Sequence, residues 1–105
     1  MVKEIISKEE FLQEINSDKP VVVDFYASWC NPCKLQAPVL HEFAEEMGDK
    51  IKVIKLDVDA VQEIAFNYSV MSIPTIMVFK NSELVEKTVG LTTKAGLSEL
   101  VIKHV

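Results

Sequence analysis

The stretch that decides the fold is Val21-Val22-Val23-Asp24-Phe25-Tyr26-Ala27-Ser28-Trp29-Cys30-Asn31-Pro32-Cys33-Lys34. It opens with an apolar run over 21–27, which predicts a strand covered on both faces at the centre of a sheet. The run leads into the only tryptophan and the only two cysteines of the chain. From Cys33 to Met47 apolar residues recur at helical spacing, and Gly48 is suited to end that helix. Two thiols therefore lie where a strand passes into a helix.

The segments on either side predict further elements of both kinds. Ser7 and Glu10 have the spacing of a capping box, which predicts a helix over 8–17. Asp59 and Gln62 have the same spacing and are expected to open a short helix that runs to about Tyr68. Further strands are predicted over 51–58, 75–80 and 83–89, and a last helix after Thr92 or Thr93. This order predicts one α/β domain over residues 1–105, with a central mixed sheet flanked by helices on both faces.

Length and composition restrict the class of protein. The chain has 105 residues, of which 49% are apolar and 26% charged, and its net charge is −5. That balance is typical of a single globular domain, and the lack of a basic cluster argues against nucleic acid or an anionic membrane as a partner. The apolar runs are too short to cross a bilayer, and residues 1–6 lack the features of a secretory signal. We therefore expect a cytoplasmic protein, in which a close pair of thiols points to catalysis or metal binding.

Three simpler explanations compete with redox chemistry for Cys30 and Cys33. A structural disulfide that closes so small a loop would stabilise the fold by only about 2 kcal/mol on the chain-entropy model. A structural zinc site needs four ligands, and His41 and His104 are far apart in the sequence, so no metal is expected. The third explanation is that both thiols are inert and buried in the core. None of the three accounts for the position of the pair at a helix entrance.

Redox chemistry does account for that position. If Cys30 lies at the N-terminus of the helix, free backbone N–H groups and the helix dipole favour its thiolate over its thiol. A thiolate is the species that attacks a disulfide. Cys33 lies one turn further in, where we expect it to reach Cys30 but not a bulky partner. Cys30 would then attack, and Cys33 would resolve the mixed disulfide.

Asp24 is the one acid in the apolar strand. Burial is expected to raise its pKa, so that it can pass a proton to or from the thiols. The alternative is that Asp24 faces solvent near the strand end. Lys55, on the neighbouring predicted strand, is a candidate to tune Asp24, although most lysines on strands are simply solvated.

The stretch from Val23 to Lys34 resembles the active-site segment of the thioredoxin family. Further matches lie along the chain, at Pro38, Lys55-Leu56-Asp57-Val58-Asp59, Ile73-Pro74-Thr75, Phe79-Lys80 and Gly90. The resemblance implies the thioredoxin fold, with a cis peptide before Pro74 that faces the cysteines. It also implies an apolar surface around the sulfurs, made by Trp29, Val58, Ile73, Pro74, Gly90 and Leu91. Asn31 and Pro32, between the cysteines, are expected to contact the substrate as well. In the family, the backbone at Ile73 pairs with an extended substrate segment.

The resemblance further implies a monomeric thiol–disulfide oxidoreductase that reduces disulfide-containing proteins. It would bind no cofactor, and its disulfide would be reset by thioredoxin reductase, a flavin enzyme that uses NADPH. The chain departs from the family at Asn31, usually glycine, at Tyr26, often tryptophan, and at Met71 and Ser72, usually a basic residue and glycine. Pro32 resembles the reductants of the family rather than the oxidants. The alternatives are an oxidant or isomerase on the same fold, and a non-catalytic module that binds partners around Trp29.

Overall fold

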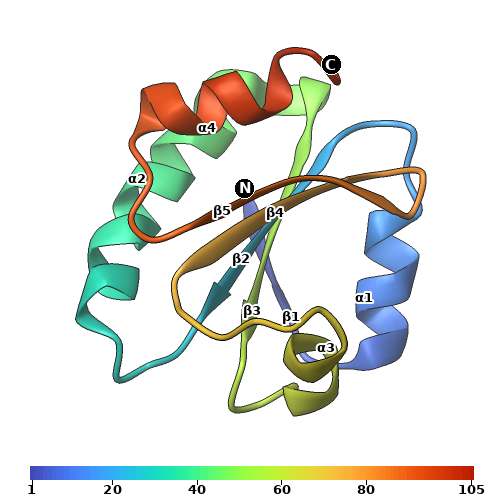
Figure 1. Cartoon of the computed structure of the whole chain (residues 1–105). Helices are drawn as coiled ribbons and strands as arrows, with labels where there is room; N and C mark the ends of the chain where they lie inside the picture. Colours follow the sequence, from blue (N-terminus) through green and yellow to red (C-terminus); the bar gives the residue numbers. More distant parts are fainter.

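The computed structural model describes residues 1–105 and contains one five-stranded sheet with helices on both sides (Figure 1). The strands are β1 (Val2–Ile5), β2 (Val21–Tyr26), β3 (Lys52–Asp57), β4 (Thr75–Lys80) and β5 (Glu83–Val89). The sheet order is β1-β3-β2-β4-β5, in which β1 and β2 run parallel to β3, and β4 and β5 are antiparallel to their neighbours. The predicted mixed sheet is confirmed, with β2 at its centre.

The helices form two layers that cover the two faces of this sheet. They are α1 (Lys8–Ile15), α2 (Asn31–Met47), α3 (Gln62–Asn67) and α4 (Lys94–Val101), and a 3₁₀ turn, η1 (Gly48–Lys50), follows α2. Apolar side chains of α1 and α3 pack on one face of the sheet, and those of α2 and α4 pack on the other. In Figure 1, α2 and α4 lie at the upper left of the sheet and α1 and α3 at its lower right. No helix is long and apolar enough to span a membrane.

Strand β1 is an element that the sequence patterns did not predict. It is only four residues long and pairs on one side alone, with β3, at the edge of the sheet. Only Ile5 is fully buried, so the apolar signal is too weak to separate β1 from a polar terminus. Ser7 caps the next helix as predicted, since its hydroxyl accepts the Glu10 N–H at 3.1 Å.

The start of α3 was predicted wrongly. The helix begins at Gln62 rather than near Asp59, and no side chain caps it. The side chain of Asp57 accepts the N–H of Asp59 at 2.9 Å, which folds 57–59 into a turn instead of a helix start. The other helices differ from prediction by a few residues at their ends, and Pro38 lies inside α2, which continues past it to Met47.

Candidate active site

The two cysteines lie at the entrance of α2, just beyond the end of β2, and form a disulfide. Cys30 is the N-cap residue of α2 and has extended backbone angles. Its Sγ accepts the backbone N–H of Cys33 at 3.2 Å, which satisfies one of the free donors of the first helical turn. Pro32 follows within that turn, where its missing N–H costs no hydrogen bond. The sulfur of Cys30 therefore has the contact that stabilises a thiolate once the disulfide is reduced.

Exposure does not separate the two cysteines as we expected from the sequence. Cys30 is 4% exposed and Cys33 is 3% exposed. Both pack with Ala27, and the side chains of Val58 and Ile73 cover this cluster. Val58 directly follows β3 and Ile73 lies two residues before β4. Both are remote from the cysteines in sequence, so the local spacing of the cysteines could not predict that Cys30 is buried. What distinguishes Cys30 is its place at the helix cap, not a larger accessible surface.

The segment before β4 lies against the sulfur of Cys30. The Ile73–Pro74 peptide bond is cis, and the carbonyl oxygen of Ile73 lies 3.8 Å from Cys30 Sγ. The N–H of Gly90 donates to the carbonyl of Pro74 at 2.8 Å, which brings the end of β5 to the same place. Gly90 has a φ of +97°, a backbone conformation that favours glycine. The structure thus brings Ile73, Pro74 and Gly90 together around the disulfide.

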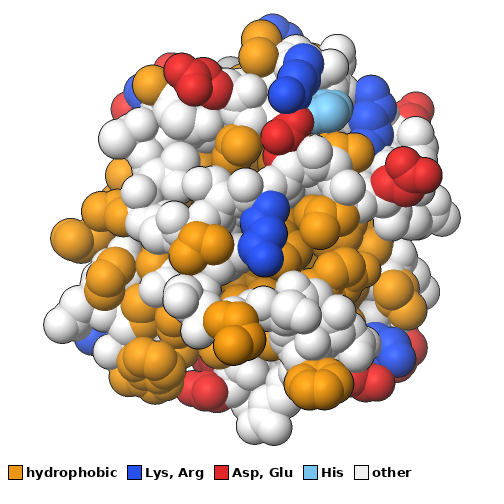
Figure 2. All heavy atoms as spheres, in the orientation of Figure 1, with side chains coloured by type: hydrophobic (Ala, Val, Ile, Leu, Met, Phe, Trp, Pro, Cys, Tyr) orange, Lys and Arg blue, Asp and Glu red, His pale blue; other side chains and the backbone are white.

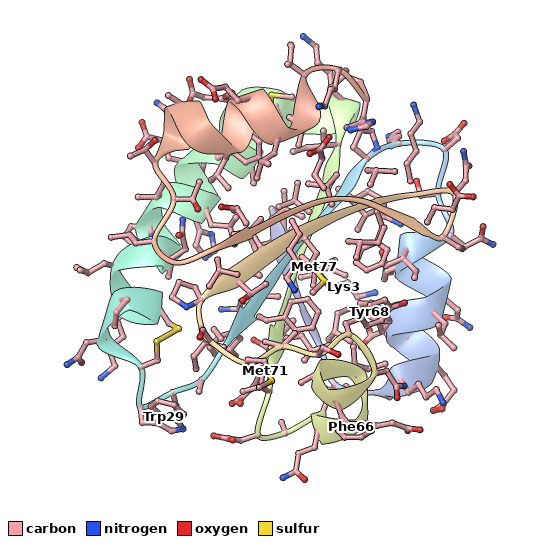
Figure 3. All side chains as sticks on the ribbon, in the orientation of Figure 1. Lys3, Trp29, Phe66, Tyr68, Met71 and Met77 are labelled. Carbon is pink, nitrogen blue, oxygen red and sulfur yellow. A yellow bond between two sulfur atoms is a disulfide. The ribbon has the colours of Figure 1, made fainter.

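Exposed apolar side chains surround the covered sulfurs. Trp29 is 67% exposed, and its indole N–H donates to Asp59 Oδ2 at 2.8 Å. Figure 3 shows the disulfide beside Trp29 at the lower end of the molecule, with Met71 and Phe66 along the same edge. Leu91 is exposed as well, whereas Pro74 is buried. Figure 2 shows hydrophobic side chains gathered over this lower part of the face. Such a patch is typical of a surface that binds another protein.

Asp24 is buried beneath this site, since it is only 2% exposed. Its Oδ1 has no hydrogen-bond partner. Burial raises the pKa of Asp24 from 3.8 to about 7, and Lys55 opposes that rise. A cavity of about 140 Å³ is lined by both Asp24 and Cys33, together with Lys34 and Ala37 of α2. This volume is large enough for water. A carboxyl group whose pKa burial raises to about 7 therefore shares a cavity with Cys33.

Lys55 lies beside Asp24 in the sheet register but does not form an ion pair with it. Its Nζ is 3.7 Å from Glu4 Oε1 and 5.5 Å from the centre of the Tyr26 ring. Lys55 still acts on Asp24 through its charge, because it lowers the pKa that burial raises. The contact between Lys55 and Glu4 was not predicted, because β1 was not.

Comparisons with known proteins agree with this geometry. The thioredoxin family model matches residues 2–103. The chain belongs to the thioredoxin family. It is 56% identical to a thioredoxin of Bacillus subtilis over 88 residues, which cover 84% of this chain and 85% of that protein. It is 45% identical to a thioredoxin of Listeria monocytogenes over the full length of both chains. A solved Plasmodium falciparum thioredoxin superposes with a TM-score of 0.89 at 36% identity, over 98% of this chain and 99% of that one.

Membership of the thioredoxin family confirms the fold and the class of activity predicted from the sequence. The chain is a thiol–disulfide oxidoreductase, with Cys30 and Cys33 as its redox pair. No group of three or more His, Cys, Asp or Glu side chains is arranged to hold a metal ion.

Gln36 is a buried polar residue of α2 that the sequence did not single out. It lies on α2 one turn after Cys33 and is fully buried. Its side-chain amide donates to the carbonyl of Thr92 at 3.0 Å, and its Oε1 accepts the N–H of Thr92 at 2.8 Å. These two bonds tie the segment after Gly90 and Leu91 to α2. The sequence shows only a polar residue among apolar helical positions, and this pattern does not predict that Gln36 bonds to the backbone of Thr92.

Gln36→Leu is expected to lower the free energy of unfolding by about 2 kcal/mol, because both backbone groups of Thr92 lose their partner. Urea unfolding measures this loss, and faster amide exchange at Thr92 should accompany it. Gln13→Leu, on the exposed side of α1, is the matched control and should change stability by less than about 0.5 kcal/mol. Equal stability of the two variants would contradict a bracing role for Gln36.

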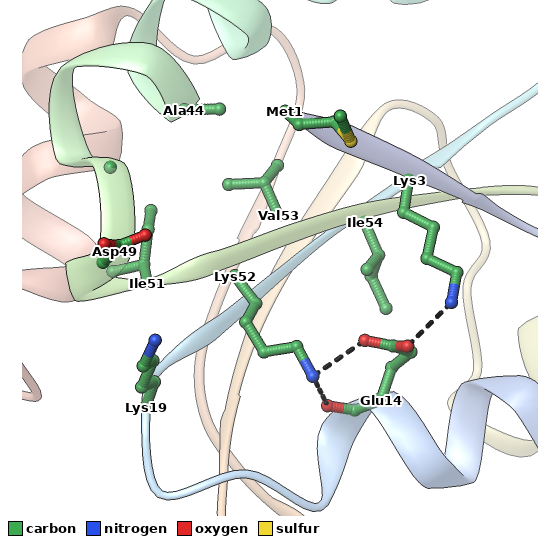
Figure 4. A pocket seen from close by; sticks show the side chains of 11 residues that line it. Met1, Lys3, Glu14, Lys19, Ala44, Asp49, Ile51, Lys52, Val53 and Ile54 are labelled. Carbon is green, nitrogen blue, oxygen red and sulfur yellow. Dashed lines mark hydrogen bonds and ion pairs between the residues drawn. The ribbon is translucent and has the colours of Figure 1, made fainter.

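The larger hollow of the molecule lies at the opposite end of the sheet, where β1 and β3 begin (Figure 4). Its volume is about 300 Å³. The carboxylate of Glu14 pairs there with Lys3 at 2.9 Å and with Lys52 at 2.8 Å. None of the candidate site residues lines this hollow, so it is separate from the redox site.

Proposed function

We propose that this protein reduces disulfides in other proteins, with Cys30 as the attacking sulfur and Cys33 as the resolving one. The observation that carries the proposal is the cap of α2, where the N–H of Cys33 points to the sulfur of Cys30. In the reduced protein this donor and the helix dipole stabilise a thiolate at Cys30. Cys33 lies within the first turn of the helix and has no comparable donor among the hydrogen bonds of the site.

The reaction proceeds by two exchanges between sulfurs. The Cys30 thiolate attacks one sulfur of the substrate disulfide, and the other substrate sulfur leaves as a thiolate. The mixed disulfide is then attacked by the thiolate of Cys33 at the sulfur of Cys30, which releases the second substrate sulfur. Two electrons pass to the substrate, and the Cys30–Cys33 disulfide forms, which is the state of the structure.

The second exchange requires that Cys33 lose its proton, and we assign the acceptor to Asp24. The shared cavity supports this assignment, because water within it can relay a proton between the carboxylate and the thiol. The pKa of about 7 supports it too, since such a carboxylate both takes up and releases a proton near neutral pH. Lys55 contributes by opposing the rise in the pKa of Asp24.

The substrate is proposed to bind as an extended segment beside Ile73. The N–H and C=O of Ile73 form no hydrogen bond with another backbone group of this chain, so both are available to a substrate strand. Substrate contacts would come from side chains and backbone around the disulfide, namely Trp29, Asn31, Pro32, Val58, Ile73, Pro74, Gly90 and Leu91. Met71, exposed two residues before Ile73, would extend this surface.

The remaining parts of the proposal rest on the family. We place the protein in the cytoplasm as a monomeric domain over residues 1–105, with no bound cofactor. Its disulfide would be reset by thioredoxin reductase with electrons from NADPH. Sedimentation of the purified protein tests the monomer directly.

The activity is tested by following NADPH oxidation with insulin as the disulfide substrate and a bacterial thioredoxin reductase as the electron donor. We expect NADPH consumption that depends on both the protein and insulin, and none with Cys30→Ser. A protein that is reduced by the reductase but leaves insulin intact would contradict the proposal. Equilibration of the cysteine pair with glutathione then separates a reductant from an oxidant, since the disulfide of a reductant is harder to reduce.

A further inference from the structure

Three ionisable side chains form a row across β1, β3 and β2 on the face of the sheet that α2 covers. Glu4 is the register partner of Lys55, and Lys55 is the register partner of Asp24. Register partners in parallel strands point to the same face of a sheet. The row ends at Ile76 of β4, which pairs with Asp24 on the other side and carries no charge. Lys55 therefore stands between an acid at the sheet edge and an acid at the sheet centre.

Lys55 contacts Glu4, the acid at the sheet edge, rather than Asp24 at the sheet centre. Its Nζ lies 3.7 Å from Glu4 Oε1, whereas it forms no ion pair with Asp24. The hydroxyl of Tyr26 donates to the same oxygen of Glu4 at 2.7 Å, and the ring of Tyr26 lies under the ammonium of Lys55 at 5.5 Å. Tyr26 thus holds the carboxylate of Glu4 in place through a strong, charge-assisted hydrogen bond. Asp24, in contrast, keeps one oxygen without any partner.

We propose that Glu4, fixed by Tyr26, is a positioning residue that draws Lys55 away from Asp24 and so sets the pH at which Asp24 exchanges its proton. The inference rests on the proposed function of Asp24 as the proton acceptor for Cys33, and it adds a control of that step from the edge strand. Glu4 touches neither the sulfurs nor the cavity. It acts through the position of one ammonium group and through its own negative charge.

The charged and titratable groups near Asp24 come from β1, β2, β3 and α2. Strand β3 contributes Lys55, and β1 contributes Glu4. Strand β2 contributes Tyr26. Burial raises the pKa of Tyr26 most, and the negative charge of Asp57 on β3 raises it further. Helix α2 contributes Cys33 and the exposed Lys34, both of which line the cavity. Burial raises the pKa of Asp24 most, Lys55 lowers it and Glu4 raises it, so the distance of Lys55 from Asp24 adjusts a pKa that burial sets.

The test is a titration of Asp24 by NMR of its side-chain carboxyl carbon in the oxidised protein, in which the sulfurs do not titrate. Glu4→Gln removes the charge that competes for Lys55, and we expect the pKa of Asp24 to fall by at least about 0.5. Glu9→Gln is the matched control, because Glu9 is an exposed acid on α1. An unchanged pKa of Asp24 in Glu4→Gln would overturn the inference.

A double variant shows whether Glu4 acts through Lys55. In a Lys55→Met background, Glu4→Gln should lower the pKa of Asp24 by clearly less than it does in the native background. An equal fall in both backgrounds would mean that Glu4 acts only by its own charge, and the positioning role would be wrong.

The pH profile of insulin reduction separates this inference from the proposed function. If Asp24 is the proton acceptor, the profile of Glu4→Gln should move to lower pH together with the pKa of Asp24. A pKa that falls while the profile stays fixed would leave the role of Glu4 intact and remove Asp24 from the proposed reaction. Because the pKa of Asp24 is read from the carboxyl group itself, a loss of activity cannot imitate a change in that pKa.

Discussion

Replacing Cys33 with serine is expected to turn the protein from a catalyst into a covalent trap. In Cys33→Ser the sulfur of Cys30 still attacks a disulfide, but no second thiol can release the captured partner. Incubation of this variant with insulin under non-reducing conditions should give a mixed disulfide, seen as an added mass on Cys30. Turnover in the coupled NADPH assay should fall to background, because the exchange that releases the reduced product no longer has an attacking thiol.

Cys30→Ser provides the matched control for the trap. If the roles are as proposed, this variant forms no lasting adduct, because the sulfur at the helix cap is missing and Cys33 lacks the donor that would ionise it. Normal turnover by Cys33→Ser, or equal trapping by both variants, would refute the division of labour between the two cysteines.

Replacing Asp24 with asparagine is expected to stabilise the protein by about 4 kcal/mol above pH 8. This is the free energy that corresponds to a pKa raised from 3.8 to about 7 by burial. The folded state holds the proton of Asp24 between these two pH values while the unfolded chain releases it. Stability of the native protein therefore falls as the pH rises through this window, and Asp24→Asn should not show that fall.

Urea unfolding of the oxidised proteins between pH 3 and pH 9 measures this difference. The native protein and Asp24→Asn should be nearly equally stable below pH 4 and should diverge up to about pH 8. Asp18→Asn, at an exposed position before β2, should follow the native protein at every pH. If the difference between the native protein and Asp24→Asn were the same at all pH values, Asp24 would not be a buried acid that titrates near neutral pH.

The centre of the fold was predictable because its signals are local. Strand β2 is an unbroken apolar run, and α2 repeats its apolar residues at helical spacing from an N-cap that the cysteine itself provides. The burial of Asp24 followed from its place in that run. The cap of the last helix was also local, since the hydroxyl of Thr93 accepts the N–H of Gly96.

The parts that sequence patterns missed depend on partners remote in the chain. β1 is recognisable as a strand only through its pairing with β3. Asp59 has a capping-box spacing, but its carboxylate accepts the indole N–H of Trp29, and its own N–H is held by Asp57. The burial of Cys30 comes from Val58 and Ile73, which lie 28 and 43 positions further along. Glu4 and Gln36 become informative only when Tyr26 and Thr92 are seen beside them.

The most direct test of the account is to ask which sulfur of the reduced protein is ionised at neutral pH. Brief alkylation with iodoacetamide between pH 5 and pH 10, followed by mass analysis of the peptide that holds both cysteines, reads this out. We expect Cys30 to react first, with a midpoint below the ordinary thiol pKa of about 8.5. First reaction at Cys33, or a midpoint for Cys30 at or above that ordinary value, would contradict the claim that the entrance of α2 holds Cys30 as a thiolate.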